Sequence, residues 1–196
     1  MTLHNLRYLT PLALAIGLAA CGSKTTTIDT TNTVTDVASN TDVAMNATGD
    51  AAAATPAQAF ADKAAKSDAF EIAAARLAAT NASSAAVKDF ATKMIAAHTD
   101  STIKIKKAAE GAAPAIVPDA TLTDEQSAKL ADLGKLKGAD FDKAYAAGQV
   151  AAHEEALALM TDYAANGDAP SLKAAAGEIV PVVKGHLVMA RALPAK

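Results

Sequence analysis

The chain has 196 residues, of which 53 are alanine, and aromatic residues make up only 4%, so the composition favours helices and excludes an all-β fold. A single cysteine excludes an internal disulfide framework and a cysteine-based zinc cluster. A net charge of −3, with scattered basic residues, indicates no nucleic-acid partner.

Residues 1–20 have the features of a secretory signal peptide. A fixed positive charge, Arg7, precedes an apolar run over residues 9–20, which is shorter than the roughly 20 residues that a membrane-spanning helix needs. The run ends in Leu-Ala-Ala directly before Cys21, and this sequence resembles the lipobox of bacterial lipoproteins. The resemblance implies cleavage before Cys21 and acylation of that cysteine, which anchors the mature protein to a membrane.

The residues that follow the cysteine indicate where the protein goes and how it is tethered. Gly22, rather than an aspartate, follows Cys21, and the lipoprotein resemblance then implies an outer-membrane lipoprotein whose folded domain faces the periplasm. Residues 22–55 contain ten threonines and no aromatic residue. Such a segment buries too little apolar surface to offset the entropy of ordering. We therefore expect residues 21–55 to form a disordered tether.

Five helices are predicted after the tether. Thr55 and Pro56 are typical of a helix start, with Gln58 three residues after the cap, so the first helix should cover about 56–80. Ser83 or Ser84 should cap the next helix. The expected ranges of the remaining helices, including a start capped by an aspartate at position 140, are about 84–110, 123–136, 140–165 and 170–192.

The lengths of the connections predict how these helices are arranged. Short turns join the first long helix to the second and the third to the fourth, so each of these pairs should be antiparallel. The connection between the second and third long helices contains the short helix, which alone spans about 20 Å. The second and third long helices should therefore start at the same end. This is the all-α, ferritin-like four-helix bundle with one long crossover, predicted here for residues 56–193.

Several short motifs follow one another along the helices in a recognisable order. They are Phe70-Glu71-Ile72, Val87-Lys88-Asp89-Phe90-Ala91 with Met94 and His98, Phe141-Asp142-Lys143-Ala144-Tyr145 with His153, and Leu172-Lys173 with Pro181 and His186-Leu187. In the order and spacing of these motifs the chain resembles the bacterial domain of unknown function 4142 (DUF4142), a ferritin-like family of secreted and lipid-anchored proteins. The similarity covers roughly residues 60–193 and implies the same fold, but the family name implies no established activity.

Three histidines, His98, His153 and His186, fall on the apolar faces of three different long helices. The first long helix contributes a carboxylate, Glu71, in a comparable place. Imidazole and carboxylate groups together bind transition metals. The pattern therefore predicts a site for Zn, Cu or Fe that takes one ligand from each long helix.

The helix periodicity and lengths also predict where these groups lie. The stripe of the last helix is expected to run through Ile179, Val182 and His186, and Glu71 lies near a stripe through Ala64 and Ser67. Counting from the helix ends at 1.5 Å per residue places His98 and His153 about 20 Å from one end of the bundle, but His186 and Glu71 only about 9–14 Å from it. The four groups are expected within two turns of each other, and this count does not place them in one layer.

Other interpretations of the histidines remain open. The interpretation that the pattern favours over a metal site is that each imidazole is a hydrogen-bonded group in an alanine-rich core. A standard di-iron centre needs Glu-x-x-His on two helices, and Ile95, Val150 and Val183 occupy the positions three residues before the histidines. A zinc-protease motif is also excluded, because Leu157 stands where its second histidine is required. The sequence thus does not indicate an enzyme.

Two functions are compatible with this sequence. The first is a membrane-anchored envelope lipoprotein that acts through its surface, in stress tolerance or by contacting another envelope protein. The alternative is a metal-binding or metal-redox bundle that uses His98, His153, His186 and Glu71. Side chains that converge on one point would favour the metal site, and imidazoles in separate layers would favour the surface function.

We expect the mature protein to begin at an acylated Cys21, because a charged start, a lipobox and a polar tether occur in that order. Mass spectrometry of the mature N-terminus measures both the cleavage site and the modification. An unmodified chain, or cleavage at another residue, contradicts the prediction.

Overall fold

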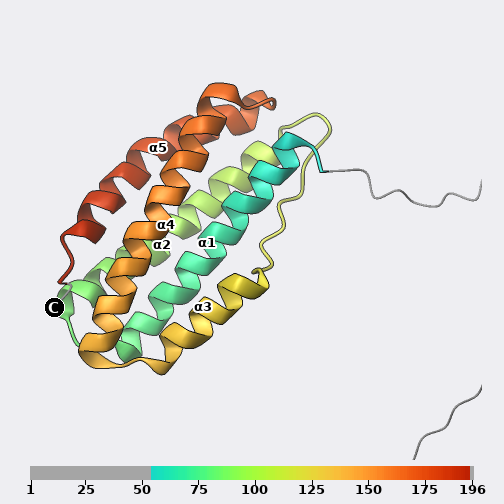
Figure 1. The fold of residues 1–196 in the computed structure, drawn as a ribbon. Helices are drawn as coiled ribbons and strands as arrows, with labels where there is room; N and C mark the ends of the chain where they lie inside the picture. The colour runs from blue at the N-terminus through green and yellow to red at the C-terminus, as the bar shows by residue number, and fades with distance from the viewer. Residues whose placement is uncertain (1–53, 195–196) are drawn as a thin grey trace, which may run out of the picture. The chain divides into compact units, whose positions relative to one another are not determined.

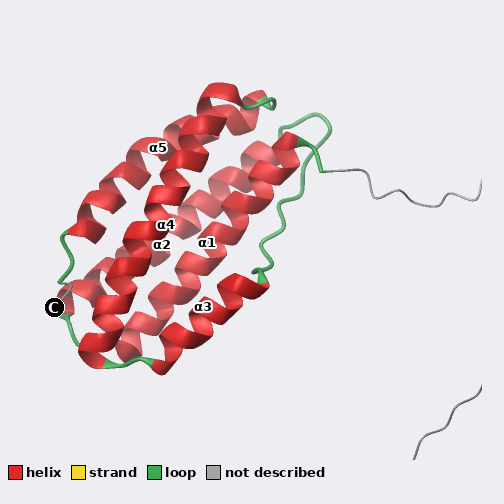
Figure 2. Ribbon diagram, in the orientation of Figure 1, coloured by secondary structure: helices red, strands yellow, loops and turns green. Residues whose placement is uncertain are grey.

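The computed structural model describes residues 54–194, which form five α-helices joined by loops (Figures 1 and 2). The expected signal peptide, Cys21 and nearly all of the tether lie outside the described residues. Within residues 54–194, no helix combines the length and the apolar character that crossing a membrane requires. The helices are α1 (Pro56–Asn81), α2 (Ala85–Glu110), α3 (Asp124–Lys135), α4 (Gly138–Asn166) and α5 (Pro170–Arg191).

Three helix starts follow the capping residues in the sequence. The hydroxyls of Thr55 and Ser84 accept hydrogen bonds from backbone N–H groups in the first turns of α1 and α2, and Thr123 with Gln126 forms a complete capping box at α3. These contacts satisfy donors that a helix leaves free at its N-terminus.

The predicted start of α4 is wrong by three residues. The helix begins at Gly138 rather than after Asp140, and the side chain of its N-cap, Lys137, makes no capping hydrogen bond to the first turn. Gly138 has a φ of +61°, a left-handed conformation that glycine adopts without steric penalty, and it turns the chain into the helix early. Asp140 therefore lies in the first turn, where a carboxylate interacts favourably with the positive end of the helix.

The four long helices form the predicted bundle with one crossover. The hairpins α1–α2 and α4–α5 pack side by side, and α2 and α4 both start at the end of the bundle where α1 finishes (Figure 1). The loop between α2 and α3 leads back along α1, and α3 packs against α1 and α4. The all-α fold with a long crossover that carries a short helix is confirmed.

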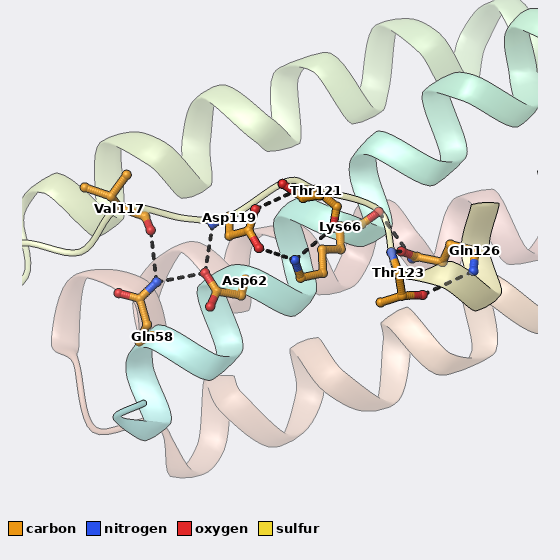
Figure 3. Close-up of polar contacts among 8 residues, drawn as sticks. All are labelled: Gln58, Asp62, Lys66, Val117, Asp119, Thr121, Thr123 and Gln126. Carbon is orange, nitrogen blue, oxygen red and sulfur yellow. Dashed lines mark hydrogen bonds and ion pairs between the residues drawn. The ribbon is translucent and has the colours of Figure 1, made fainter. Parts of the chain in front are cut away.

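Polar contacts hold the crossover loop against α1 (Figure 3). The Gln58 side chain donates to the Asp62 carboxylate at 2.8 Å and to the Val117 carbonyl at 2.9 Å, and Asp62 also accepts from the Asp119 backbone N–H at 2.8 Å. Lys66 pairs with the Asp119 carboxylate one turn further along the helix. The loop is thereby fixed along the side of α1 on its way to α3.

A single carboxylate, Asp142, ties the start of α2 to the start of α4. Its oxygens accept hydrogen bonds from the backbone N–H groups of Ser83 and Ser84, at 3.2 and 2.9 Å, and from the Ser83 hydroxyl. Asp142 is buried, so these charge-assisted hydrogen bonds are little weakened by solvent. The two parallel helices therefore start at nearly the same level.

The core divides into two apolar clusters along the bundle axis. The proximal cluster lies around the first turns of α1, and the distal cluster lies around the turn between α1 and α2. The proximal cluster consists of Ala57, Phe60, Ala61, Ala64, Ile105, Ala109, Ile116, Met160, Tyr163, Leu172, Ala175, Ala176, Ile179 and Val183. The distal cluster consists of Ala74, Ala75, Ala78, Ala82, Val87, Phe90, Ala91, Met94, Phe141, Tyr145 and Ala190.

The buried face of α5 differs by one residue from the predicted stripe. Val182 is 48% exposed, whereas Val183 is buried in the proximal cluster. The buried positions advance by four residues from Ile179 to Val183 and by three from Val183 to His186. From Ile179 to His186 the sequence is compatible with a step of three residues followed by one of four, as predicted, or with four followed by three, as observed. Both orders span seven residues and return to the same helix face.

Candidate metal centre

A buried polar layer separates the two apolar clusters. Every long helix contributes to it, at the point where its residues pass from one cluster to the other. Buried polar side chains in the middle of an apolar core require hydrogen-bond or ligand partners. The polar layer consists of Asp68 and Glu71 on α1, His98 on α2, Gln149 and His153 on α4, and His186 on α5.

The three histidines form a compact triangle inside the polar layer. Their ring centroids are 5.6 Å apart for His98 and His153, 6.0 Å for His98 and His186, and 5.4 Å for His153 and His186. The rings are inclined to one another by 47–78° rather than stacked. Three helices therefore bring one imidazole each to the same small volume.

Asp68 orients the His98 ring. The Nδ1 atom of His98 lies 2.8 Å from Oδ1 of Asp68, and the other carboxylate oxygen accepts from the Thr102 hydroxyl at 3.1 Å. Because a carboxylate only accepts hydrogen bonds, Nδ1 of His98 donates. In the neutral ring, this leaves the lone pair on Nε2.

His153 is oriented by its own helix. Its Nδ1 atom donates to the backbone carbonyl of Gln149, one turn earlier in α4, at a distance of 2.8 Å. A carbonyl oxygen cannot donate, so the lone pair of the neutral ring is again on Nε2. Burial lowers the pKa of His153 to about 4, although the hydrogen bond to Gln149 opposes that shift.

His186 completes the triangle from α5. Burial, and the neighbouring imidazoles of His153 and His98, lower the pKa of His186 to about 4. His153 and His186 are therefore neutral at pH 7, which is the form in which imidazole binds a metal ion.

Each histidine has a buried ring nitrogen without a hydrogen-bond partner in the part of the chain that the structure describes: Nε2 of His98, Nε2 of His153 and Nδ1 of His186. One ring nitrogen from each residue lies within 4.8 Å of the other two. A metal ion placed at the centre of three nitrogens this close would lie no more than about 2.8 Å from each of them. Metal–imidazole bonds are about 2.0–2.1 Å long. Small side-chain rotations thus suffice to bring three nitrogens into bonding range.

Glu71, the fourth predicted ligand, lies outside this group of converging atoms. Its carboxylate accepts a hydrogen bond from the side-chain nitrogen of Gln149, and its other oxygen has no partner among residues 54–194. Burial raises the pKa of the Glu71 carboxyl, although the proximity of His98 opposes the shift. Glu71 therefore belongs to the polar layer beside the histidines and not to their triangle.

The structure adds one residue that the sequence analysis missed. Asp68 is buried four residues after Ala64 and three before Glu71, so it follows the same helical spacing as both. The predicted stripe passed through Ser67 instead, which is only half-buried. The 3–4 spacing of Ala64, Asp68 and Glu71 was the available signal for the residue that positions His98.

The predicted heights of the side chains also need correction. His186 lies beside His153 rather than one or two turns away from it. His153 follows fifteen residues after the start of α4, whereas only five residues separate His186 from the end of α5. At 1.5 Å per residue, α5 stops about 15 Å short of the level at which α4 begins. The predicted heights were counted from helix ends that were taken to lie at the same level of the bundle.

Comparisons with known proteins identify the family and the fold. A family model described as "Domain of unknown function (DUF4142)" matches residues 42–193. A solved structure described as "CopM in the Cu(I)-bound form" superposes with a TM-score of 0.58 at 16% sequence identity, covering 71% of this chain and 95% of that one. At this identity the likeness shows a shared helical-bundle fold. A search of curated proteins gives no significant match.

The metal-free protein should lose stability as the pH falls from about 6.5 to about 4. Unfolded histidines take up protons near pH 6.5, whereas His153 and His186 in the folded protein do so only near pH 4. Between these values the unfolded state binds more protons, so acid favours unfolding. Urea denaturation with a chelator present, at several pH values from 7.5 to 4, measures this effect.

The matched control is the double variant His153→Leu/His186→Leu, measured in the same way. It lacks both buried histidines but retains the pair of His98 and Asp68. Other titrating groups, including Glu71, are common to both proteins. The double variant should lose less stability than the wild type over the same pH interval. Equal losses in the two proteins would contradict the assignment of buried, neutral imidazoles.

Proposed function

The chain belongs to the DUF4142 family, and we propose that it binds a transition-metal ion through His98, His153 and His186. The observation that carries the proposal is the convergence of three buried ring nitrogens, one from each of three helices, to within 4.8 Å of one another. An arrangement of this kind supplies three of the ligands that a small metal ion needs.

The surroundings of the imidazoles support this proposal. Two of the rings are neutral at pH 7, and two are held in a fixed orientation by hydrogen bonds from their Nδ1 atoms. The carboxylate of Asp68 behind His98 and the carbonyl of Gln149 behind His153 are the outer partners that metal-binding histidines usually have. Such contacts raise the basicity of the ring and fix which nitrogen faces the ion.

Copper is the ion that we propose to test first. Imidazole suits zinc, copper and iron alike, so the three histidines alone do not choose among them. The protein of the same fold described as CopM is in a Cu(I)-bound form, which supports copper as the first candidate. Binding, rather than catalysis, is the proposed activity, since the positions three residues before the histidines lack the glutamates of a di-iron centre.

We also propose that the metal site belongs to an envelope lipoprotein. Residues 1–20 would direct export, an acylated Cys21 would anchor the chain in the outer membrane, and residues 21–55 would hold the bundle in the periplasm. A protein that acts only through its surface has no need for imidazoles in one layer. Their convergence favours the metal-binding function over the surface function.

Copper should stabilise the folded protein at neutral pH. A ligand that binds only the folded state stabilises it by about 2.7 kcal/mol when its free concentration is 100 times its dissociation constant. The measurement is the melting temperature of the full chain with and without Cu(I), Cu²⁺ or Zn²⁺. Cys21→Ser should be present throughout, because the thiol of the only cysteine is itself a soft copper ligand. His98→Ala and His186→Ala should each abolish the shift.

Melting curves without metal must first show that these variants fold, since a lost buried contact costs about 1–3 kcal/mol on its own. Lys104→Ala, which removes an exposed side chain that pairs with Glu178, is the control that should leave the shift unchanged. No metal-dependent shift in the wild type, with no metal found in the purified protein, would remove the proposal.

Asp68 should raise the affinity of the site for the metal ion without binding the ion itself. Asp68→Asn keeps the size of the side chain but weakens its hold on the His98 ring, and the loss of such an outer partner typically lowers metal affinity about 10–100-fold. Competitive titration against a chelator measures the change. Asp62→Asn, six residues earlier on α1 and bound to the crossover loop, is the matched control. Equal affinities for Asp68→Asn and wild type would show that Asp68 has no positioning role.

A further inference from the structure

A small cavity lies directly beside the histidine triangle. Its volume is about 30 Å³, which is enough for one water-sized group. His98 and His186 both line it, together with Asp68, and its lining includes residues of all four long helices.

The cavity lies on the proximal side of the polar layer. Ala64, Met160, Ile179 and Val183 line it, and all four belong to the proximal cluster. None of its lining residues belongs to the distal cluster. The space next to the histidines therefore opens toward the proximal cluster, in which Met160 is the one methionine.

Met160 lies on the same face of α4 as His153. It follows His153 by seven residues, two helical turns, and its side chain is only 4% exposed. Methionine has three rotatable bonds, so a buried thioether can adjust its position to an adjacent ion. Met160 thus lines a cavity that His98 and His186 also line.

Of the two carboxylates nearby, one has both oxygens engaged and the other does not line the cavity. Asp68 has one carboxylate oxygen on His98 and the other on Thr102. Glu71 is bound to Gln149 and does not line the cavity. Among the cavity-lining residues, this leaves Met160 as the soft donor for a fourth position beside three imidazoles.

We propose that the thioether of Met160 is the fourth ligand of the metal site, and that it makes the site prefer monovalent copper to zinc. This inference rests on the proposed function. Thioether sulfur is a soft ligand that suits Cu(I), whereas zinc sites use thiolate, imidazole and carboxylate ligands. The donor set is therefore three nitrogens and one uncharged sulfur.

The test compares Cu(I) and Zn²⁺ affinities in three proteins, each carrying Cys21→Ser: the wild type, Met160→Leu and Met94→Leu. Met94 is the matched control, because it is fully buried on α2 one turn before His98 but belongs to the distal cluster. Leucine keeps the volume of methionine, so both variants should fold. We expect Met160→Leu to weaken Cu(I) binding about tenfold or more and to leave Zn²⁺ binding unchanged, and Met94→Leu to change neither.

X-ray absorption spectroscopy of the Cu(I) protein gives a second readout. A copper–sulfur contact should be present in the wild type and in Met94→Leu and absent in Met160→Leu. If metal-free melting shows that Met160→Leu is unfolded, Met160→Val takes its place. Wild type without a copper–sulfur contact, or Met160→Leu with wild-type Cu(I) affinity, would overturn the inference. In either case, loss of binding in the histidine variants would leave the proposed function intact, whereas a wild type that binds no metal removes both.

Discussion

The burial of a polar layer in the middle of an apolar bundle is the constraint on which the rest of this structure depends. Two apolar clusters of alanine, aliphatic, aromatic and methionine side chains are separated by a layer of Asp68, Glu71, His98, Gln149, His153 and His186. Each buried polar atom without a partner costs about 1–3 kcal/mol, and six such atoms occur in the polar layer and its neighbour Tyr145 within the described part of the chain. The apolar clusters on both sides must supply the stability that keeps these groups in place. A cation bound by the imidazoles, as proposed, would give three of the atoms a partner.

The arrangement of the helices brings the ligands to one level. His98 lies thirteen residues after the start of α2, and His153 lies fifteen residues after the start of α4. Because the crossover lets both helices start at the same end, this difference corresponds to only about 3 Å along the axis. Asp142 fixes the two starts to each other through the backbone of the α1–α2 turn. The register of the candidate site is thus set at the end of the bundle, far from the histidines.

The three imidazoles are positioned in three different ways. A carboxylate on a neighbouring helix holds His98, a carbonyl one turn earlier on the same helix holds His153, and the Nδ1 atom of His186 has no partner among residues 54–194. A ring fixed by a hydrogen bond offers its lone pair in a set direction, whereas a ring held by packing can rotate. His186 is therefore the side chain best able to adjust as the triangle contracts around an ion.

The sequence by itself determined the helices, the crossover and the three histidines on apolar faces, because alanine content, capping residues and 3–4 spacing act locally along the chain. It also placed Glu71 in the buried layer. Only the tertiary structure decided that His186 is level with His153, that Asp68 holds His98, and that Glu71 binds Gln149 rather than joining the triangle. These relations depend on where each helix ends relative to its neighbours. That offset is set by packing between helices, and a periodicity measured along one helix does not contain it.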